Sequence, residues 1–337
     1  MATIMMRVRQ IAGIALYLGL ANAQEASWRS PVNVLSRKGL VADQISTIWW
    51  FLFSTASLVF LVVITLLLIA LFKKGQAVPK GPVQENSSVR PILYLGTGLT
   101  IIVLLITAVY TFISMRTLAA PSQKPALTFE IVGKQWWWDV RYEGESISAN
   151  ELHIPSGEPV HFSLHSDNVI HSFWLPDLAG KRDLIPGHPN SLWLQADEPG
   201  TYRGSCAEFC GVQHGKMNFT VIAEPRAAFE TWLEHARAEA NAAVSEEARV
   251  GQAIFMQQGC AGCHSIRGTA AQGEIGPELT HLSSRLTLAA ANIPNTTGHL
   301  AAWIVDSQSI KPGNRMPSQK LSGEDLQFLL SYLMELN

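Results

Sequence analysis

The four cysteines of this 337-residue chain lie in two close pairs, and each pair is followed by other residues that bind metals. Cys206 and Cys210 belong to the pattern C-x3-C-x3-H-x2-M, which continues with His214 and ends with Met217. Two thiolates, an imidazole and a thioether form a soft set of ligands, which suits copper better than zinc or magnesium. A further ligand is needed, and His171 stands at the start of a β-rich stretch that a sheet would bring beside this loop. The pattern therefore predicts a copper site.

Two other interpretations of these residues stay open on chemistry alone. Cys206, Cys210, His214 and His171 would also complete a tetrahedral structural zinc site, without Met217. In an oxidising compartment the two cysteines would instead form a disulfide. The thioether favours copper over both alternatives.

The second cysteine pair forms the motif C-x-x-C-H, with Cys260, Cys263 and His264. This motif attaches haem c covalently: both thiols bind the porphyrin, and the adjacent histidine lies under the iron. The alternative is a thioredoxin-like redox pair followed by an unrelated histidine. The rest of the C-terminal segment favours the haem.

That segment resembles class I cytochromes c over nearly its whole length. Residues 311–317 contain Met316 at the place where those cytochromes carry the sixth iron ligand. The resemblance implies that Met316 is the axial ligand opposite the motif's histidine. Met256, His281 and His299 are the competing side chains.

Two uncharged runs, residues 48–72 and 91–115, precede both motifs. Each is longer than the roughly 20 apolar residues that span a bilayer, so we expect two membrane helices. The basic segment between them is predicted to be cytoplasmic, which places both outer ends across the membrane. Residues 1–23, with Arg7 and Arg9 before an apolar run, are expected to be a secretory signal peptide.

The overall composition excludes other classes of protein. Hydrophobic residues make up 47% of the chain and charged residues 15%, which rules out a disordered polymer. The net charge of -2 combines a basic front with an acidic middle, since Lys+Arg against Asp+Glu is 10 against 3 in residues 1–120 and 9 against 16 in residues 121–240. This is not the pattern of a nucleic-acid binder.

After residue 120 the sequence changes to short β-rich runs separated by turn residues, which predicts an antiparallel sandwich or barrel. His161 and His165 alternate with apolar residues, so they are expected on the solvent face. The expected strands are 127–132, 136–142, 160–165, 172–175, 191–195 and 219–223. The expected parts of the chain are the signal peptide 1–23, a helical hairpin 24–120, a β domain 121–224, a helical linker 225–244 and a helical domain 245–337.

The copper motif and its surroundings resemble the CuA subunit, subunit II, of cytochrome c oxidase. Residues 135–138 match the family's Gln-Trp-aromatic-Trp strand, and residues 181–187 match its Lys-x-Asp-x-x-Pro-Gly turn. The resemblance covers residues 40–225 and implies an all-β cupredoxin-like domain behind a two-helix transmembrane hairpin. With the all-α cytochrome c domain, the chain would be a multidomain, membrane-anchored protein. The implied ligands of a binuclear CuA centre are Cys206 and Cys210 bridging both coppers, His171 and His214 binding one each, Met217 as a weak ligand and the backbone carbonyl of Glu208.

Further roles rest on this resemblance. Trp136 would be the side chain through which electrons enter, although an ordinary sheet aromatic fits it equally. Glu85 would lie at the mouth of a proton path, or be an ordinary loop acid, because the family's Trp-Thr pair is missing after it. The Glu208 side chain would bind magnesium at the subunit interface, and Phe209 would shield the copper site.

The resemblance implies subunit II of a haem-copper cytochrome c oxidase in a bacterial inner membrane, with its C-terminal domains in the periplasm. Its partners would be catalytic subunit I, subunit III and a soluble or membrane electron donor. Electrons would pass from the donor to haem c, to CuA and to the catalytic subunit, which reduces dioxygen and pumps protons. Neither membrane run contains a histidine, so the dioxygen site must lie in another subunit. Two rivals remain: the small subunit of a CuA-containing nitric oxide reductase, and a free-standing membrane-tethered electron carrier.

Overall fold

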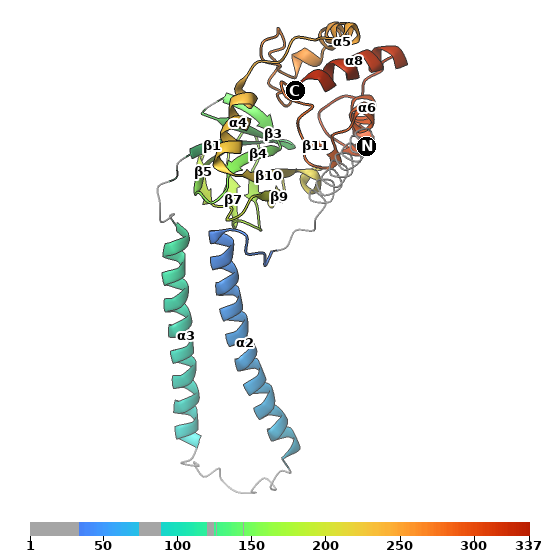
Figure 1. The fold of residues 1–337 in the computed structure, drawn as a ribbon. Coiled ribbons are helices and arrows are strands. Elements are labelled where there is room, and N and C mark those ends of the chain that lie inside the picture. The colour runs from blue at the N-terminus through green and yellow to red at the C-terminus, as the bar shows by residue number, and fades with distance from the viewer. Residues whose placement is uncertain (1–33, 74–88, 120–124, 126, 144) are drawn as a thin grey trace, which may run out of the picture. The chain divides into compact units, whose positions relative to one another are not determined.

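The computed structural model describes residues 34–73, 89–119, 125, 127–143 and 145–337 (Figure 1). The expected signal peptide 1–23 and the proposed proton-path residue Glu85 lie outside these residues, so both stay predictions. The chain divides into two compact units, Asp43–Ser122 and the remainder.

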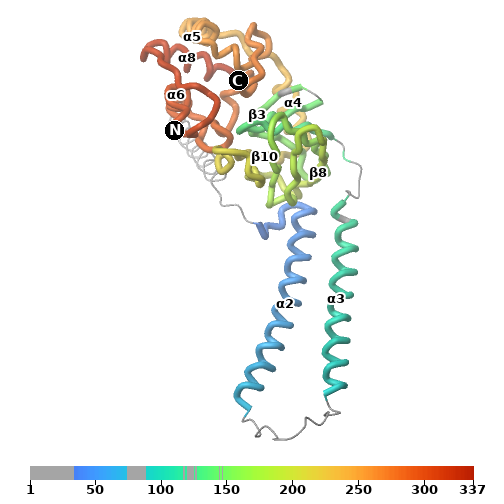
Figure 2. The backbone as a smooth tube through the Cα atoms, turned by 180° about the vertical axis from the view of Figure 1, so that it is seen from behind, coloured from blue at the N-terminus to red at the C-terminus, as the bar shows by residue number. Residues whose placement is uncertain are grey.

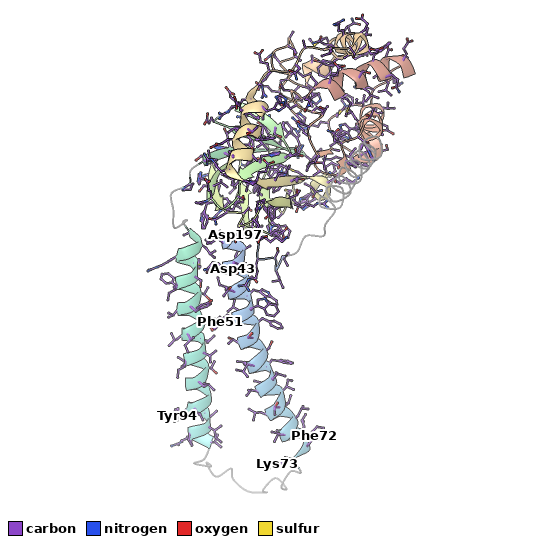
Figure 3. All side chains as sticks on the ribbon, viewed as in Figure 1. Asp43, Phe51, Phe72, Lys73, Tyr94 and Asp197 are labelled. Atoms are coloured by element: carbon purple, nitrogen blue, oxygen red, sulfur yellow. The ribbon has the colours of Figure 1, made fainter. Side chains whose placement is uncertain are left out.

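Two long helices dominate the first unit. They are α2 (Leu40–Phe72) and α3 (Val89–Ala119), which extend the expected runs into their polar flanks. The helices run side by side (Figure 1 and Figure 2), and the ring centroids of Phe51 and Tyr110 lie 4.5 Å apart between them. Apolar side chains project from both along their length, and Phe72 near the end of α2 is 81% exposed (Figure 3). Both helices are long and apolar enough to cross a membrane.

The second unit contains a β-sandwich of two five-stranded sheets. One sheet has the strand order β3-β2-β1-β5-β8 and the other β4-β10-β9-β6-β7. The strands are β1 (Leu127–Lys134), β2 (Trp137–Tyr142), β3 (Glu145–Ala149), β4 (Glu151–Pro155), β5 (Val160–Ser166), β6 (His171–Trp174), β7 (Lys181–Leu184), β8 (Asn190–Leu194), β9 (Gly200–Cys206) and β10 (Asn218–Glu224).

The sandwich is mixed rather than antiparallel, which corrects the expectation. Strands β1 and β5 pair in parallel, as do β4 and β10. Parallel neighbours need a long connection, and here the connecting chain supplies other strands of the sandwich. The alternation in β5 is as predicted, because its apolar side chains are buried while His161 and His165 are half-exposed.

Aromatic side chains fill the interior between the sheets. Trp138, Phe162, Phe173 and Phe219 are fully buried, and the rings of Phe173 and Phe219 stack with centroids 4.1 Å apart. The Trp138 ring also meets the ring of His171 edge-on, at 6.0 Å between centroids. The core therefore reaches the first predicted copper ligand and restrains its position.

Helix α4 (Arg226–Arg237) covers part of the expected linker 225–244, and the residues after it are not helical. Phe229 on α4 is 1% exposed and packs against Phe129 of the sandwich, with centroids 6.3 Å apart. The helix thus completes the β domain instead of bridging solvent. After α4 the chain packs against the helical domain, where the Ala240 N–H donates to the Arg267 carbonyl at 3.1 Å.

The C-terminal domain is built from short helices around one apolar core. Ser245 caps the first of them by accepting the Ala248 N–H at 3.1 Å, as its Ser-Glu-Glu sequence suggests. Helices α5 and α8 cross closely, and the rings of Phe255 and Tyr332 meet at 5.9 Å between centroids. The elements are α5 (Glu246–Gln257), the 3-10 turn η2 (Cys260–Gly262), the short strands β11 (Thr287–Leu288) and β12 (Ile293–Pro294), α6 (Thr297–Val305), α7 (Ser307–Ile310) and α8 (Gly323–Glu335).

Candidate metal and cofactor sites

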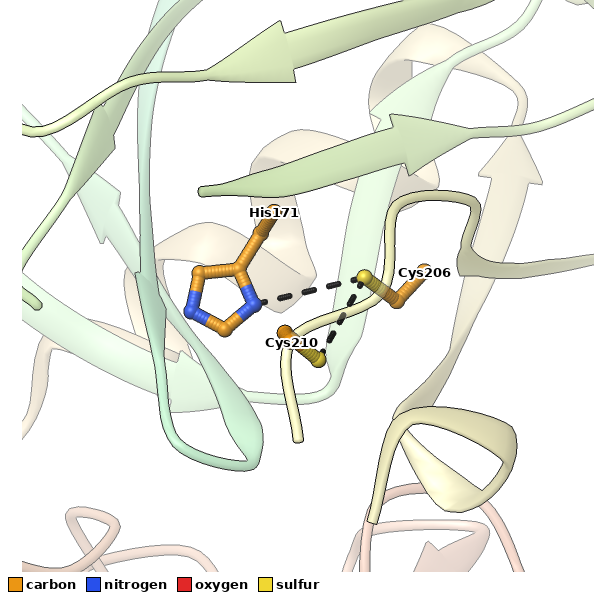
Figure 4. Close-up of side chains that lie close together, drawn as sticks. All are labelled: His171, Cys206 and Cys210. Carbon is orange, nitrogen blue, oxygen red and sulfur yellow. Dashed lines mark hydrogen bonds between the residues drawn. The ribbon is translucent and has the colours of Figure 1, made fainter. Parts of the chain in front are cut away.

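Neighbouring strands bring the first three predicted copper ligands together. His171 is the first residue of β6 and Cys206 the last of β9, and these strands pair through Phe173 and Cys206. The Cys206 Sγ lies 4.0 Å from His171 Nδ1 and 3.8 Å from Cys210 Sγ (Figure 4). The donor atoms of His171, Cys206 and Cys210 all lie within 4.8 Å of one another, and all three residues are buried.

The loop between β9 and β10 supplies the remaining predicted ligands. It closes through the Cys206 N–H, which donates to the Met217 carbonyl at 2.9 Å. Cys210 Sγ lies 3.8 Å from His214 Nδ1 and 3.8 Å from the fully buried Met217 Sδ. The Glu208 carbonyl oxygen lies 3.2 Å from Cys206 Sγ. The loop thus gathers soft sulfur and nitrogen donors in one buried place, a donor set that fits copper.

The protonation pattern prepares this pocket for a cation. The hydrogen bond between Cys206 and Cys210, followed by those with His171 and nearby backbone, lowers the pKa of the Cys206 thiol despite its burial. The same contact and burial raise the pKa of Cys210, because the two sulfurs share one proton. His171 Nδ1 lies on the side of Cys206 Sγ, while its Nε2 lies 3.3 Å from the Asn168 Oδ1.

The structure decides against one alternative and one expectation about this loop. The two sulfurs are 3.8 Å apart and both cysteines are free, so no disulfide joins them in the structure. Phe209 is 77% exposed, so it does not shield the pocket within this chain. Its neighbour Glu208 turns its carboxylate outward to Lys181 Nζ, at 3.6 Å.

A mostly apolar cavity contains the four predicted haem residues. Cys260, Cys263, His264 and Met316 all line it. The competing side chains Met256, His281 and His299 are not among its lining residues. His281 instead has its Nε2 3.1 Å from the Ala238 carbonyl, and His299 bonds Thr296.

The ring of His264 is fixed in one tautomer. Its Nδ1 donates to the Pro277 carbonyl at 2.7 Å, and burial lowers its pKa. A carbonyl only accepts, so Nδ1 carries the proton and the neutral ring keeps a lone pair on Nε2. Gly276 lets the backbone approach this ring, since a Cβ there would lie 2.5 Å from His264 Cε1. A neutral ring with a free lone pair on Nε2 is the state in which a histidine binds iron.

The methionine loop is held just as firmly. The Met316 N–H donates to the Asn314 Oδ1 at 2.8 Å, and its carbonyl accepts from Ser307 Oγ at 2.6 Å and Gln308 Nε2 at 3.0 Å. Backbone bonds on both sides of Met316 therefore fix where the residue meets the cavity.

Sequence reasoning missed several residues of this cavity. Arg285, 9% exposed, lines it, and burial lowers its pKa although Glu278 beside it opposes the shift. Lys311 also lines it and is 3% exposed. No local pattern distinguishes these two cations from surface ones, because their burial depends on contacts between distant segments.

The β domain contributes to the wall of the same cavity. Gln135, Trp136 and Trp137 line it together with residues of the helical domain. The Trp136 indole N–H also donates to the Cys210 carbonyl at 2.9 Å. One tryptophan therefore touches both the cavity and the copper loop.

Comparison with known proteins agrees with this geometry. The family model described as "Cytochrome C oxidase subunit II, periplasmic domain" matches residues 147–224, and the one described as "Cytochrome c" matches residues 248–337. A cytochrome c oxidase subunit 2 of Alkalihalophilus pseudofirmus is 39% identical over 247 residues, which are 71% of each chain. The chain belongs to the cytochrome c oxidase subunit 2 family. A cytochrome c oxidase subunit 2 of Bacillus sp. strain PS3 is 32% identical over 71% of this chain and 72% of its own length.

Membership of the subunit 2 family confirms the expected fold class. The two apolar helices make the chain a two-pass membrane protein, followed by a cupredoxin-like domain and a cytochrome c domain, which implies a haem. As a subunit 2, it is part of an oxidoreductase complex with other subunits. The periplasmic domain of subunit II of cytochrome oxidase of Bradyrhizobium japonicum matches 34% of this chain and 96% of its own, with 29% identity and a TM-score of 0.33.

Proposed function

We propose that this chain is the subunit at which electrons enter a haem-copper terminal oxidase. When bound, haem c and a binuclear CuA centre supply the one-electron couples that link a donor to the catalytic subunit, which reduces dioxygen to water and pumps protons. The observation that carries the proposal is the position of Trp136, which lines the cavity of the haem motif and bonds the Cys210 carbonyl. The role proposed for Trp136 is to connect the two sites.

For the copper centre we propose the ligands Cys206, Cys210, His171, His214, Met217 and the Glu208 carbonyl. A single tetrahedral zinc needs all four donor atoms close to one point. His214 contacts Cys210 but lies outside the group of three whose donor atoms are within 4.8 Å of one another. This spread supports two metal ions over one.

For the haem we propose thioether bonds to Cys260 and Cys263, with His264 and Met316 as axial ligands. The free Nε2 of His264 and the anchored Met316 loop support this assignment. The buried guanidinium of Arg285 fits the acidic side chains that a haem carries, since a buried cation is stabilised by a nearby anion.

The remaining assignments complete this proposal. The Glu208 carboxylate, half-exposed beside Lys181, would hold magnesium at a contact with another subunit. The two sites would face the periplasm of a bacterial inner membrane, with subunits I and III and an electron donor as partners. The proposed domain boundaries are those expected from the sequence, except that α4 belongs to the β domain and does not form a helical linker.

Purification of the full chain from its native membrane in mild detergent tests the proposal. We expect a large polytopic partner, dioxygen consumption, a c-type optical band and a mixed-valence copper EPR signal. Nitric oxide reduction without dioxygen consumption would establish the first rival function, and a chain isolated without partners would establish the second.

Zinc in place of copper, or no iron, would overturn the cofactor assignment. Met316→Ala tests the axial ligand separately, because it should give a ligand-exchanged haem of lower potential. An unchanged spectrum would reject Met316.

A further inference from the structure

A buried charged cluster lies outside both cofactor sites, where the β domain, α4 and the cytochrome domain meet. It consists of Glu151, His153 and Glu224, which we call the junction cluster. Glu151 and His153 lie on β4, and Glu224 ends the neighbouring strand β10. Glu151 and His153 are 5% and 6% exposed. Neither the copper nor the haem assignment uses these residues.

The His153 ring bridges the two acids. Its Nδ1 lies 3.0 Å from Glu224 Oε2 and its Nε2 3.6 Å from Glu151 Oε1. One face of the ring stacks on Trp232 of α4, with centroids 3.9 Å apart and planes 8° from parallel. A cation in this position compensates two acidic groups at once, so the charged ring suits the pocket.

Glu151 also bonds a residue of the cytochrome domain. Its second oxygen, Oε2, accepts the backbone N–H of Leu286 at 2.9 Å. Leu286 precedes β11, and the adjacent Arg285 lies close enough for the Glu151 charge to raise its pKa against the effect of burial. The carboxylate of Glu151 therefore joins the β domain to the wall of the haem cavity.

The other groups facing His153 carry no charge of their own. On β2, the Tyr142 hydroxyl donates to the His153 carbonyl at 3.0 Å and accepts its N–H at 2.9 Å, and burial raises the pKa of Tyr142. On α4 the facing side chain is Trp232. The charge on the cytochrome side is Arg285, which acts on Glu151. Within the cluster itself, His153 is the group whose charge can compensate both carboxylates.

We infer that the junction cluster positions the cytochrome domain on the β domain, and that loss of the proton from His153 loosens this contact. Burial opposes the charged ring, but the close carboxylates of Glu151 and Glu224, the latter hydrogen-bonded to Nδ1, outweigh it and raise the pKa of His153. A raised pKa means that the stabilisation is complete below the ordinary value of about 6.5 and is lost as pH rises through the folded value. The inference rests on the proposed function only for its consequence, the rate of electron transfer between the two sites.

Hydrogen exchange of the full chain in detergent tests the contact itself, because it needs no assignment of either cofactor. The readout is protection of the peptide containing Leu286, corrected for the intrinsic effect of pH, in wild type and in His153→Gln. Removing a buried charge partner shifts a local equilibrium by roughly 10-fold or more. We expect the ratio of wild-type to variant protection to be about 10 near pH 6 and to fall towards 1 near pH 9.

Two further variants and one internal control complete the design. Glu151→Gln keeps an oxygen for the Leu286 N–H but removes the charge, so it should lower protection at every pH. Glu198→Gln, an exposed acid of the same domain, should leave it unchanged. The β5 peptide reports whether the sandwich itself is intact.

A protection ratio of 1 at pH 6 with an intact β5 peptide would overturn the inference. A ratio that stays constant from pH 6 to 9 would overturn the role of the proton. The electron-transfer rate from haem to copper, measured by flash photolysis in the same variants, should fall with the loss of protection. If protection falls and this rate does not, the contact is real but its effect on electron transfer is rejected, and the proposed function is untouched.

Discussion

The indole N–H of Trp136 and the side-chain Nε2 of Gln135 both donate to the carbonyl oxygen of Cys210, each at 2.9 Å. Trp136 is thereby bonded to Cys210 in the middle of the copper loop, and it also lines the haem cavity. Its carbonyl oxygen in turn accepts from Lys311 Nζ at 3.1 Å. Contacts from both domains therefore fix this tryptophan in place.

The first prediction concerns electron transfer through Trp136. Trp136→Phe keeps an aromatic ring but removes the bond to Cys210, so haem-to-copper electron transfer should slow by roughly 10- to 100-fold, as displaced redox partners react more slowly. The free energy of unfolding should fall by only about 1 kcal/mol, because Gln135 still donates to the same carbonyl. Flash photolysis measures the rate. The control is Trp137→Phe, which alters another residue of the cavity wall; equal rates in both variants would exclude the proposed route.

The second prediction concerns the close approach of Gly276 to His264. Gly276→Ala would place a Cβ 2.5 Å from the ring, so the ring must move and its bond to Pro277 must weaken. We expect a destabilisation of about 1–3 kcal/mol and an altered haem spectrum. In Gly298→Ala the new Cβ has no atom within 4 Å. That control should be neutral or stabilise α6 by up to about 1 kcal/mol in a thermal melt, with the haem band unchanged.

The third prediction separates the two cofactor sites. Cys206→Ser removes the sulfur that lies near His171, Cys210 and the Glu208 carbonyl, so the copper EPR signal should disappear while the haem band remains. Loss of both signals would show that the sites do not form independently. Met217→Leu conserves volume in a fully buried position, so copper should stay bound with a changed potential.

The sequence was sufficient to name candidate side chains that the structure then brings together, because metal and haem ligation require specific side chains at short spacings. Cys206, Cys210, His214 and Met217 come from one loop, and the haem motif spans five consecutive residues. His171 needed only the expectation that two strands pair. These are local or nearly local relationships, and a pattern of residue types records them.

The docking of the cytochrome domain was not predictable in this way. It depends on bonds such as the one from Asn292 Nδ2 to the Lys216 carbonyl, at 2.7 Å, between residues far apart in the chain. Arg285 and Lys311 are ordinary polar positions in the sequence but are 9% and 3% exposed in the structure, and Lys311 bonds to Trp136 of the other domain. The parallel strand pairs have the same origin, since their partners are set by the path of the whole sandwich.

The fourth prediction concerns the pH dependence that Lys311 gives to this docking. Burial, and then the charge of Lys216, lower the pKa of Lys311 to about 7, although Cys210 acts in the opposite direction. From pH 7 to its ordinary value of 10.5, a released lysine holds a proton that the docked lysine has lost. The free energy needed to separate the cytochrome domain from the β domain should therefore rise with pH over this range, by at most about 1.4 kcal/mol per pH unit. This stabilisation is lost as pH falls towards 7.

Lys311→Met isolates this contribution from that of His153, which has the opposite sign. The variant loses one hydrogen bond to Trp136, worth about 1 kcal/mol, but no longer buries a charge below pH 7. We expect it to be at least as stable as wild type at pH 6.5 and to gain less stability than wild type between pH 7 and 9. Denaturant unfolding followed at the haem absorption measures both slopes. Identical slopes of stability against pH in the two proteins would contradict the prediction. They would mean that Lys311 keeps its proton in the folded protein, so that its burial does not lower its pKa.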